Sequence, residues 1–183
     1  VRSRLVSRRT ATINQIRAFL IEQGITVRTG AHALRNSLFA ILENRIDEIS
    51  PRMNDLIVGL NADWQELDER IETITGEIET ISKSEKNCQR LMSVPGIGPI
   101  ISTAMVAAIG TGDAFGRGRD FGARLGLVPR QYSTGGKTVL GRISKRGSKY
   151  LRTLFIQAAH VILMRPNNWQ KFSFGPWLTE AAT

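Results

Sequence analysis

The chain has 183 residues, with 25 Lys and Arg against 16 Asp and Glu and a formal net charge of +9. Its length suits one domain or two small ones, and its basic charge favours a polyanionic partner, of which nucleic acid is the commonest. The single cysteine, Cys88, excludes an internal disulfide and a cysteine-based zinc site, and the apolar runs are too short to cross a membrane.

The first fifty residues have the periodicity of two amphipathic helices. One is predicted over residues 3–23 and ended by Gly24, and the other over residues 31–49. The inward-facing positions are Leu5, Ile13, Ile16 and Leu20 in the first helix, and Leu34, Leu38, Ile41, Leu42 and Ile46 in the second. Ser50 and Pro51 then have the residue types of a helix N-cap and first turn.

A heptad pattern follows, in which apolar residues recur at alternating steps of four and three. Its members are Leu60, Trp64, Leu67, Ile71, Ile74, Ile78 and Ile81. This spacing predicts a long helix with a coiled-coil seam. The seam needs a cover, because each large side chain left in water costs roughly 1.5–3 kcal/mol. Its partner is either the first helices of this chain or the same helix of a second copy.

The segment VPGIGP, residues 94–99, separates two further predicted helices, of which the second covers residues 100–109. Gly96 and Gly98 permit a tight turn with positive φ, and the second helix begins with unpaired N–H groups that favour phosphate. The turn resembles that of helix-hairpin-helix DNA-binding modules, so Gly96, Ile97 and Gly98 are candidate DNA contacts. A purely structural turn between packed helices is the alternative.

The next stretch places hydroxyl groups in concentrated positive charge. A short helix is predicted over residues 119–127, and Pro129 then opens a loop in which Ser133 and Thr134 precede Gly135-Gly136. No acid lies between Asp120 and Glu180, while the loop and its flank carry Arg130, Lys137, Arg142, Lys145, Arg146, Lys149 and Arg152. Such a loop suits the binding and attack of a phosphodiester, or only backbone contact with nucleic acid. An amphipathic helix is predicted from about 148 to 164, followed by an aromatic tail over residues 166–183.

Three motifs in this order, PGIGP, GLVPRQYSTGGK and LGRISKRGSKYLR, resemble the C-terminal domain of the IS-one-ten type insertion-sequence transposases, whose elements encode a bridge RNA. The resemblance implies a mainly α fold in four parts. These are the end of a RuvC-like domain (1–50), a coiled-coil segment (51–87), a transposase domain with helix-hairpin-helix and serine loop (88–165), and the aromatic tail (166–183).

The resemblance also implies a chemistry. Ser133 would be the nucleophile that exchanges DNA strands through a covalent serine–DNA intermediate, guided by the bridge RNA. Mg²⁺ would be held by four acids of the RuvC-like domain. Asp47, Glu48 and Asp55 lie in amphipathic helical contexts, so no metal site is expected in this chain.

The chain begins at Val1 without an initiator Met, which leads us to expect a portion of a longer protein. By itself it is expected to bind nucleic acid without strand transfer. A homo-oligomer formed through the coiled coil and a cytoplasmic, nucleoid-associated location are further expectations.

Two alternatives use the same residues. One is a non-enzymatic helix-hairpin-helix DNA-binding module with a dimerising coiled coil, in which Ser133 has no chemical role. The other is a structural coiled-coil protein whose basic end is an ordinary solvated surface.

Overall fold

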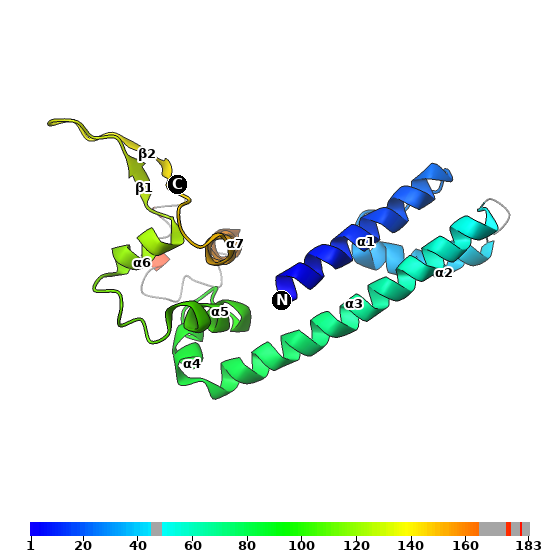
Figure 1. The fold of residues 1–183 in the computed structure, drawn as a ribbon, viewed down its shortest axis with the longest axis horizontal. Coiled ribbons are helices and arrows are strands. Elements are labelled where there is room, and N and C mark those ends of the chain that lie inside the picture. Colours follow the sequence, from blue (N-terminus) through cyan, green and yellow to red (C-terminus); the bar gives the residue numbers. More distant parts are fainter. Residues whose placement is uncertain (45–48, 165–174, 177–179, 181–183) are drawn as a thin grey trace. The chain divides into compact units, whose positions relative to one another are not determined.

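The computed structural model describes residues 1–44, 49–164, 175–176 and 180, and they form a mainly α fold, as predicted (Figure 1). The chain divides into two compact units, Val1–Glu77 and Ile78–Thr183. The first unit holds α1 (Arg2–Glu22), α2 (Ala31–Asn44) and most of α3 (Pro51–Ser84). The second holds the end of α3, then α4 (Lys86–Met92), α5 (Pro99–Ile109), α6 (Gly118–Leu125), β1 (Pro129–Gln131), β2 (Leu140–Ile143) and α7 (Lys149–Met164). This division falls inside α3, within the predicted coiled-coil segment.

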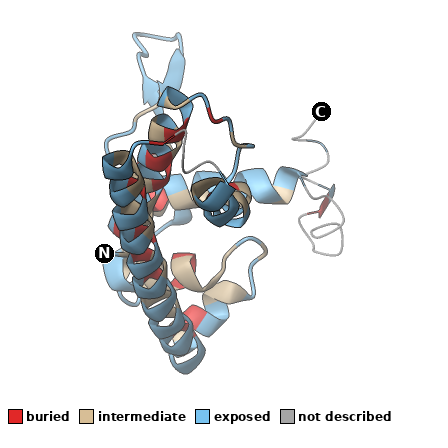
Figure 2. Ribbon diagram, turned by 90° about the vertical axis from the view of Figure 1, so that its right-hand side faces the viewer, coloured by how far each residue is buried: buried red, intermediate tan, exposed pale blue. Residues whose placement is uncertain are grey.

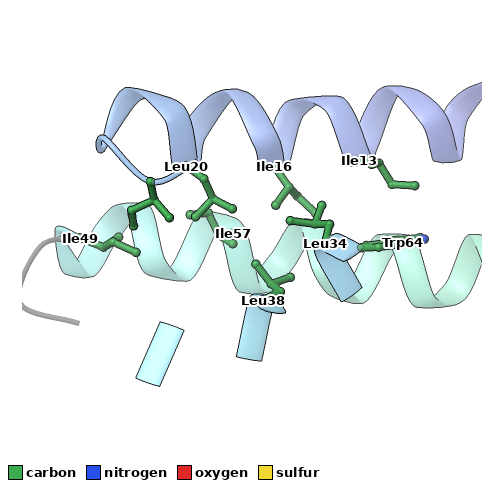
Figure 3. Packing of buried hydrophobic residues seen from close by; sticks show 9 residues of the cluster. Ile13, Ile16, Leu20, Leu34, Leu38, Ile49, Ile57 and Trp64 are labelled. Carbon is green, nitrogen blue, oxygen red and sulfur yellow. The ribbon is translucent and has the colours of Figure 1, made fainter. Parts of the chain in front are cut away.

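The core of the first unit lies between α1, α2 and α3 (Figure 3). Helices α1 and α3 run antiparallel side by side, and α2 packs against both. The predicted inward positions of α1 are all buried, and Leu34 and Leu38 of α2 are buried with them. Figure 2 shows the buried residues as red segments on these helices. The 3.6-residue periodicity therefore identified the buried faces of both helices.

The ends of these helices follow from local backbone chemistry. Gly24 has a φ of 76°, and its N–H donates to the carbonyl of Ile21, while the Ile25 N–H donates to Leu20. These two bonds form a Schellman cap, and Leu20 and Ile25 are both buried beneath it. At the start of α3 the Ser50 hydroxyl accepts the N–H of Met53 at 3.3 Å, as expected of an N-cap.

The heptad seam has its partner within this chain over the first part of its length. Trp64 belongs to the main core, and Leu67 and Ile71 form a second cluster with Leu5 of α1. Farther along α3, Ile81 is 54% exposed. Helix α1 therefore covers the seam as far as Ile74, and a coiled coil between two copies stays a prediction.

The second helix was predicted to reach Ile49, and this bound was wrong. Helix α2 is described over Ala31–Asn44, and Ile49 is buried in a bend outside it. Ile46 lies outside the described residues, as do Asp47 and Glu48. The aromatic residues of the tail, Trp169, Phe172, Phe174 and Trp177, lie outside them as well.

In the second unit, α4 and α5 pack together and α7 packs against α5 and α6. Phe115, Phe121 of α6 and Phe155 of α7 form two successive edge-to-face ring contacts, with centroids 5.7 and 5.9 Å apart.

The segment after Pro129 was expected to be a loop, but it forms the antiparallel pair β1–β2. Within the part of the chain that the structure describes, no helix is long and apolar enough to span a membrane.

Candidate functional site

Ser133 lies near the tip of the β1–β2 hairpin. Strand β1 pairs with β2 in a register that sets Pro129 opposite Ile143 and Gln131 opposite Leu140. The pairing continues beyond the strands through a bridge between Thr134 and Lys137. Gly135 and Gly136 connect these two residues, and the φ of Gly135 is 60°. A positive φ at the first of two central residues is typical of a type II′ hairpin turn, which explains the glycine pair.

The Ser133 hydroxyl oxygen accepts two hydrogen bonds in an exposed position. The Gln131 Nε2 donates to Oγ at 2.9 Å, and the backbone N–H of Val139 donates at 3.3 Å. Because the oxygen accepts both bonds, the hydroxyl proton stays available to an outside acceptor. Two donors would also stabilise negative charge that develops on Oγ when the proton leaves. The geometry suits a nucleophile more than a buried structural hydroxyl.

The other hydroxyls of the motif have different surroundings. The Ser148 Oγ accepts the N–H of Leu151 at 3.4 Å and caps α7. Ser144 is half-buried at the base of the hairpin, where its N–H donates to Val128. Thr134 is exposed in the turn, next to Ser133. Ser133 is thus set apart by the two hydrogen bonds that its side-chain oxygen accepts.

Six of the seven basic residues of this region are exposed, namely Arg130, Lys137, Arg142, Lys145, Arg146 and Lys149. Figure 2 shows the hairpin that carries several of them in the colour of exposed residues. Arg130 reaches the carbonyl of Ser144 at 3.5 Å. Since no acid occurs in the sequence between Asp120 and Glu180, local acids do not neutralise this charge. The hairpin that carries Ser133, its base and the start of α7 thus present a series of exposed positive charges.

Arg152 differs from these six residues. It is only 9% exposed, and its guanidinium donates to the carbonyls of Leu125 at 2.9 Å and Gly147 at 3.3 Å. Its charge is therefore directed at the backbone that joins α6 to the base of the hairpin. We assign Arg152 a structural role and leave it out of the phosphate-binding set.

Two glycines allow that backbone to pack closely. A Cβ on Gly147 would lie 1.8 Å from the carbonyl oxygen of Arg124, and one on Gly126 would lie 2.7 Å from the Gly147 nitrogen. The Ser148 N–H also donates to the Arg124 carbonyl at 3.1 Å. This contact between the end of α6 and the residues before α7 holds both ends of the hairpin in place.

The VPGIGP turn joins α4 to α5. The Ile97 N–H donates to the Val94 carbonyl at 3.1 Å, and Gly96 has a φ of 81°. With Pro95 before it, this is the pattern of a type II turn. Gly98 was expected to share the positive φ, but it is extended, with φ −103° and ψ −174°, and acts as the N-cap residue of α5. Ile97 is half-buried, and Gly96 faces Ile162 of α7 closely.

Sequence reasoning did not identify Gln131 as part of this site. In a β-strand, residues two apart lie on the same face, so Gln131 and Ser133 are neighbours once the segment is extended. The signal was present in the QYS spacing, but it required a strand where a loop was expected.

No group of three or more His, Cys, Asp or Glu side chains within residues 1–44 and 49–164 is placed to hold a metal ion.

Comparison with known proteins shows that this chain is similar to transposases. Residues 88–173 match the Transposase IS116/IS110/IS902 family. The chain is 39% identical over 168 residues to the "Transposase for insertion sequence element IS1111A" of Coxiella burnetii. The aligned region covers 92% of this chain and 46% of that protein. It is 41% identical over 165 residues to the "Transposase for insertion sequence element IS1328" of Yersinia enterocolitica, covering 90% and 48%.

The chain therefore spans about half the length of the curated relatives that it matches. The matched family region begins in α4 and includes the VPGIGP turn, the serine hairpin and α7. Through these residues the chain matches the IS116/IS110/IS902 transposase family, and most of the chain is similar to the two transposases named above.

Proposed function

We propose that this chain takes part in DNA transposition, with Ser133 as the nucleophile that attacks a DNA phosphodiester. The observation that carries the proposal is the position of the Ser133 Oγ. It is exposed near the tip of a hairpin that carries several exposed basic residues, and it accepts hydrogen bonds from Gln131 and Val139. The match of residues 88–173 to a transposase family supports DNA as the substrate.

In the proposed step, a bond forms between the Ser133 Oγ and phosphorus while the bond from phosphorus to a deoxyribose oxygen breaks. The serine proton passes to a base, and the leaving oxygen takes up a proton. A serine hydroxyl is a weak nucleophile at its ordinary pKa and needs such a base. The N–H groups of Gln131 and Val139 would stabilise the oxygen as it loses its proton.

The exposed basic side chains would bind the phosphates on either side of the attacked group. Arg130 is nearest in sequence, and its fork of N–H donors suits two phosphate oxygens. Lys137 is placed in the hairpin turn itself, opposite Thr134. Positive charge at these positions would also stabilise the charge that builds up on the phosphate during attack.

The proposed reaction also requires components outside this chain. A bridge RNA would pair with target and donor DNA, and a RuvC-like domain with four acids would hold Mg²⁺ and supply the base. In the described part of this chain no cluster of acids is placed to hold that ion, so the chain would contribute the nucleophile and the basic side chains. Self-association through the exposed end of the α3 seam would bring two copies to the DNA.

The test uses a full-length transposase that contains this chain. Ser133→Ala should abolish both recombination and any covalent protein–DNA species detected on denaturing gels. Thr134→Ala, which removes the adjacent hydroxyl, should retain both. A Ser133→Ala protein that still recombines DNA would show that the nucleophile is another group.

A second candidate is a binding module without chemistry, and the turn at Gly96 favours it. The type II turn leads directly into the N-terminus of α5, where first-turn N–H groups can bind phosphate without reading bases. In that case Ser133→Ala leaves recombination intact, and substitutions at the Gly96 turn reduce DNA affinity. Detection of a covalent protein–DNA species that depends on Ser133 would support the nucleophile, and its absence would support the binding module.

A further inference from the structure

A small pocket that contains several charged and aromatic residues lies in the first unit, away in sequence from the serine hairpin. It has a volume of about 190 Å³ and is lined by Arg9, Ala31, His32, Arg35, Trp64 and Asp68. The three helices α1, α2 and α3 each contribute to it. Its wall holds two guanidinium groups, an imidazole and an indole, but a single carboxylate.

Two of the residues that line this pocket each carry a buried N–H donor with no acceptor among the residues that the structure describes. The donors are the Nε1 of Trp64, a residue that is 1% exposed, and the Nε of Arg9. Figure 3 shows the Trp64 nitrogen at the end of the side chain that points away from Leu34 and Leu38. Since a buried donor without an acceptor destabilises the folded protein, this pair calls for an acceptor group.

The charges of the pocket are fixed in place. Arg9 NH1 contacts Asp68 Oδ1 at 3.0 Å, and Arg35 NH2 contacts the other oxygen of the same carboxylate. Arg35 also lies over the Trp64 ring, 4.7 Å from its centroid. Two positive charges against one negative charge leave a net charge of +1. The carboxylate thus orients both guanidinium groups without neutralising them.

Helix α2 adds the positive end of its dipole to the same pocket. Ala31 and His32 form its first turn, and no acid occupies that turn. Arg17 holds the preceding loop by donating to the carbonyls of Arg28 at 2.9 Å and Gly30 at 2.6 Å. The first-turn amides of α2 are therefore held in a set position at the pocket wall.

We propose that this pocket binds one phosphate group as an oxyanion. A group with a single negative charge matches the net charge of +1, and a phosphodiester carries that charge. Trp64 Nε1, Arg9 Nε and the free N–H groups of Arg35 would donate to its oxygens. The group comes either from a nucleic-acid backbone or from free phosphate. The proposal is independent of Ser133 chemistry.

The test follows the indole N–H signal of Trp64 in ¹⁵N-labelled chain, assigned by its disappearance in Trp64→Phe. The probes are inorganic phosphate, the dinucleotide TpT and the uncharged methylphosphonate analogue of TpT, all at constant ionic strength. A saturable shift is expected with a phosphate-bearing probe and none with the analogue. A shift with TpT assigns the nucleic-acid backbone as a source, and a shift with inorganic phosphate alone assigns free phosphate.

Two variants sharpen the result. Arg35→Gln should weaken binding about tenfold or more, since it removes charge-assisted hydrogen bonds from an exposed side chain. Arg8→Gln removes the same charge from an exposed position of α1 outside the pocket and should leave binding within about twofold. The absence of a saturable shift, an equal shift with the analogue, or an equal weakening in both variants would each overturn the proposal.

Discussion

At the scale of single residues, the base of the serine hairpin depends on the absence of side chains. Gly126 and Gly147 let the end of α6 meet the residues before α7 backbone to backbone, and Arg152 bonds to carbonyls on both sides. The chain enters the hairpin and leaves it at this contact. Stability and site geometry are therefore linked through two positions that carry no functional group.

Gly147→Ala is expected to destabilise the chain by about 3 kcal/mol or more, because its Cβ would lie 1.8 Å from the Arg124 carbonyl oxygen, a backbone atom that cannot rotate away. The measurement is urea denaturation followed by circular dichroism. Gly136→Ala, in the open turn with nothing within 4 Å, should stay within about 0.5 kcal/mol of the parent. Equal stability of both variants would contradict the close approach of the two backbones.

Gln131 is expected to position Ser133 and to stabilise its oxygen during attack. In the full-length protein, Gln131→Leu removes the donor that lies 2.9 Å from Oγ and should slow formation of the covalent species by about tenfold or more. DNA affinity should stay unchanged, because the amide carries no charge. Gln131→Asn keeps the amide on a side chain that is one methylene shorter, and it tests whether the amide must reach the Ser133 Oγ. A decrease in affinity as large as the decrease in rate would argue against a role in positioning.

At the scale of elements, one core holds α1, α2 and α3 together. Ile16, Leu20, Leu34, Ile57 and Trp64 are almost fully buried within it. The heptad pattern of α3 was read correctly as a stripe that needs a cover. The pattern could not identify the cover, since any apolar helix of suitable length satisfies it.

Ile16→Ala tests this packing. The side chain is 0% exposed, so its truncation should cost about 2–5 kcal/mol through reduced burial and the cavity left behind. Ile21→Ala removes the same atoms from a position on α1 that is 62% exposed and should have a much smaller effect. Thermal unfolding of the two variants gives the comparison, and similar midpoints would show that α1 does not pack against α3.

At the scale of the whole molecule, charge is unevenly distributed along the sequence. The acids lie mainly in and around α3, whereas the stretch from residue 121 to residue 179 has none. The exposed basic residues of that stretch lie on the hairpin that carries Ser133, at its base and at the start of α7. This distribution predicts that nucleic-acid binding depends on the second unit and weakens with salt.

Reversing Lys145, Arg146 and Lys149 to Glu should reduce DNA affinity and make its salt dependence shallower, by about 0.9 log unit for each phosphate that the protein no longer neutralises. Reversing the exposed Arg4, Arg8 and Arg28 changes the net charge equally and serves as the control. Binding of a duplex across a range of salt concentrations gives both slopes. Identical slopes would indicate that only net charge matters and that the hairpin region does not bind DNA at a defined position.

The mainly α class, the buried faces of α1 and α2, the caps at Gly24 and Ser50, and the basic character of the segment that contains Ser133 could all be predicted from the sequence. These features depend on periodicity and on local backbone chemistry, which act over a few residues. The sequence also contained the ordered motifs of the transposase family.

Only the tertiary structure decided what covers the α3 seam, that the serine segment is a hairpin, and that Arg152 is buried. Each depends on contacts between residues far apart in the chain. The strands β1 and β2 are three and four residues long and carry little periodicity of their own. Their pairing is set by the Gly-Gly turn at one end and by the contact of Gly126 with Gly147 at the other. The Arg9, Arg35 and Asp68 cluster likewise forms only when three helices meet, because its members are widely separated in sequence.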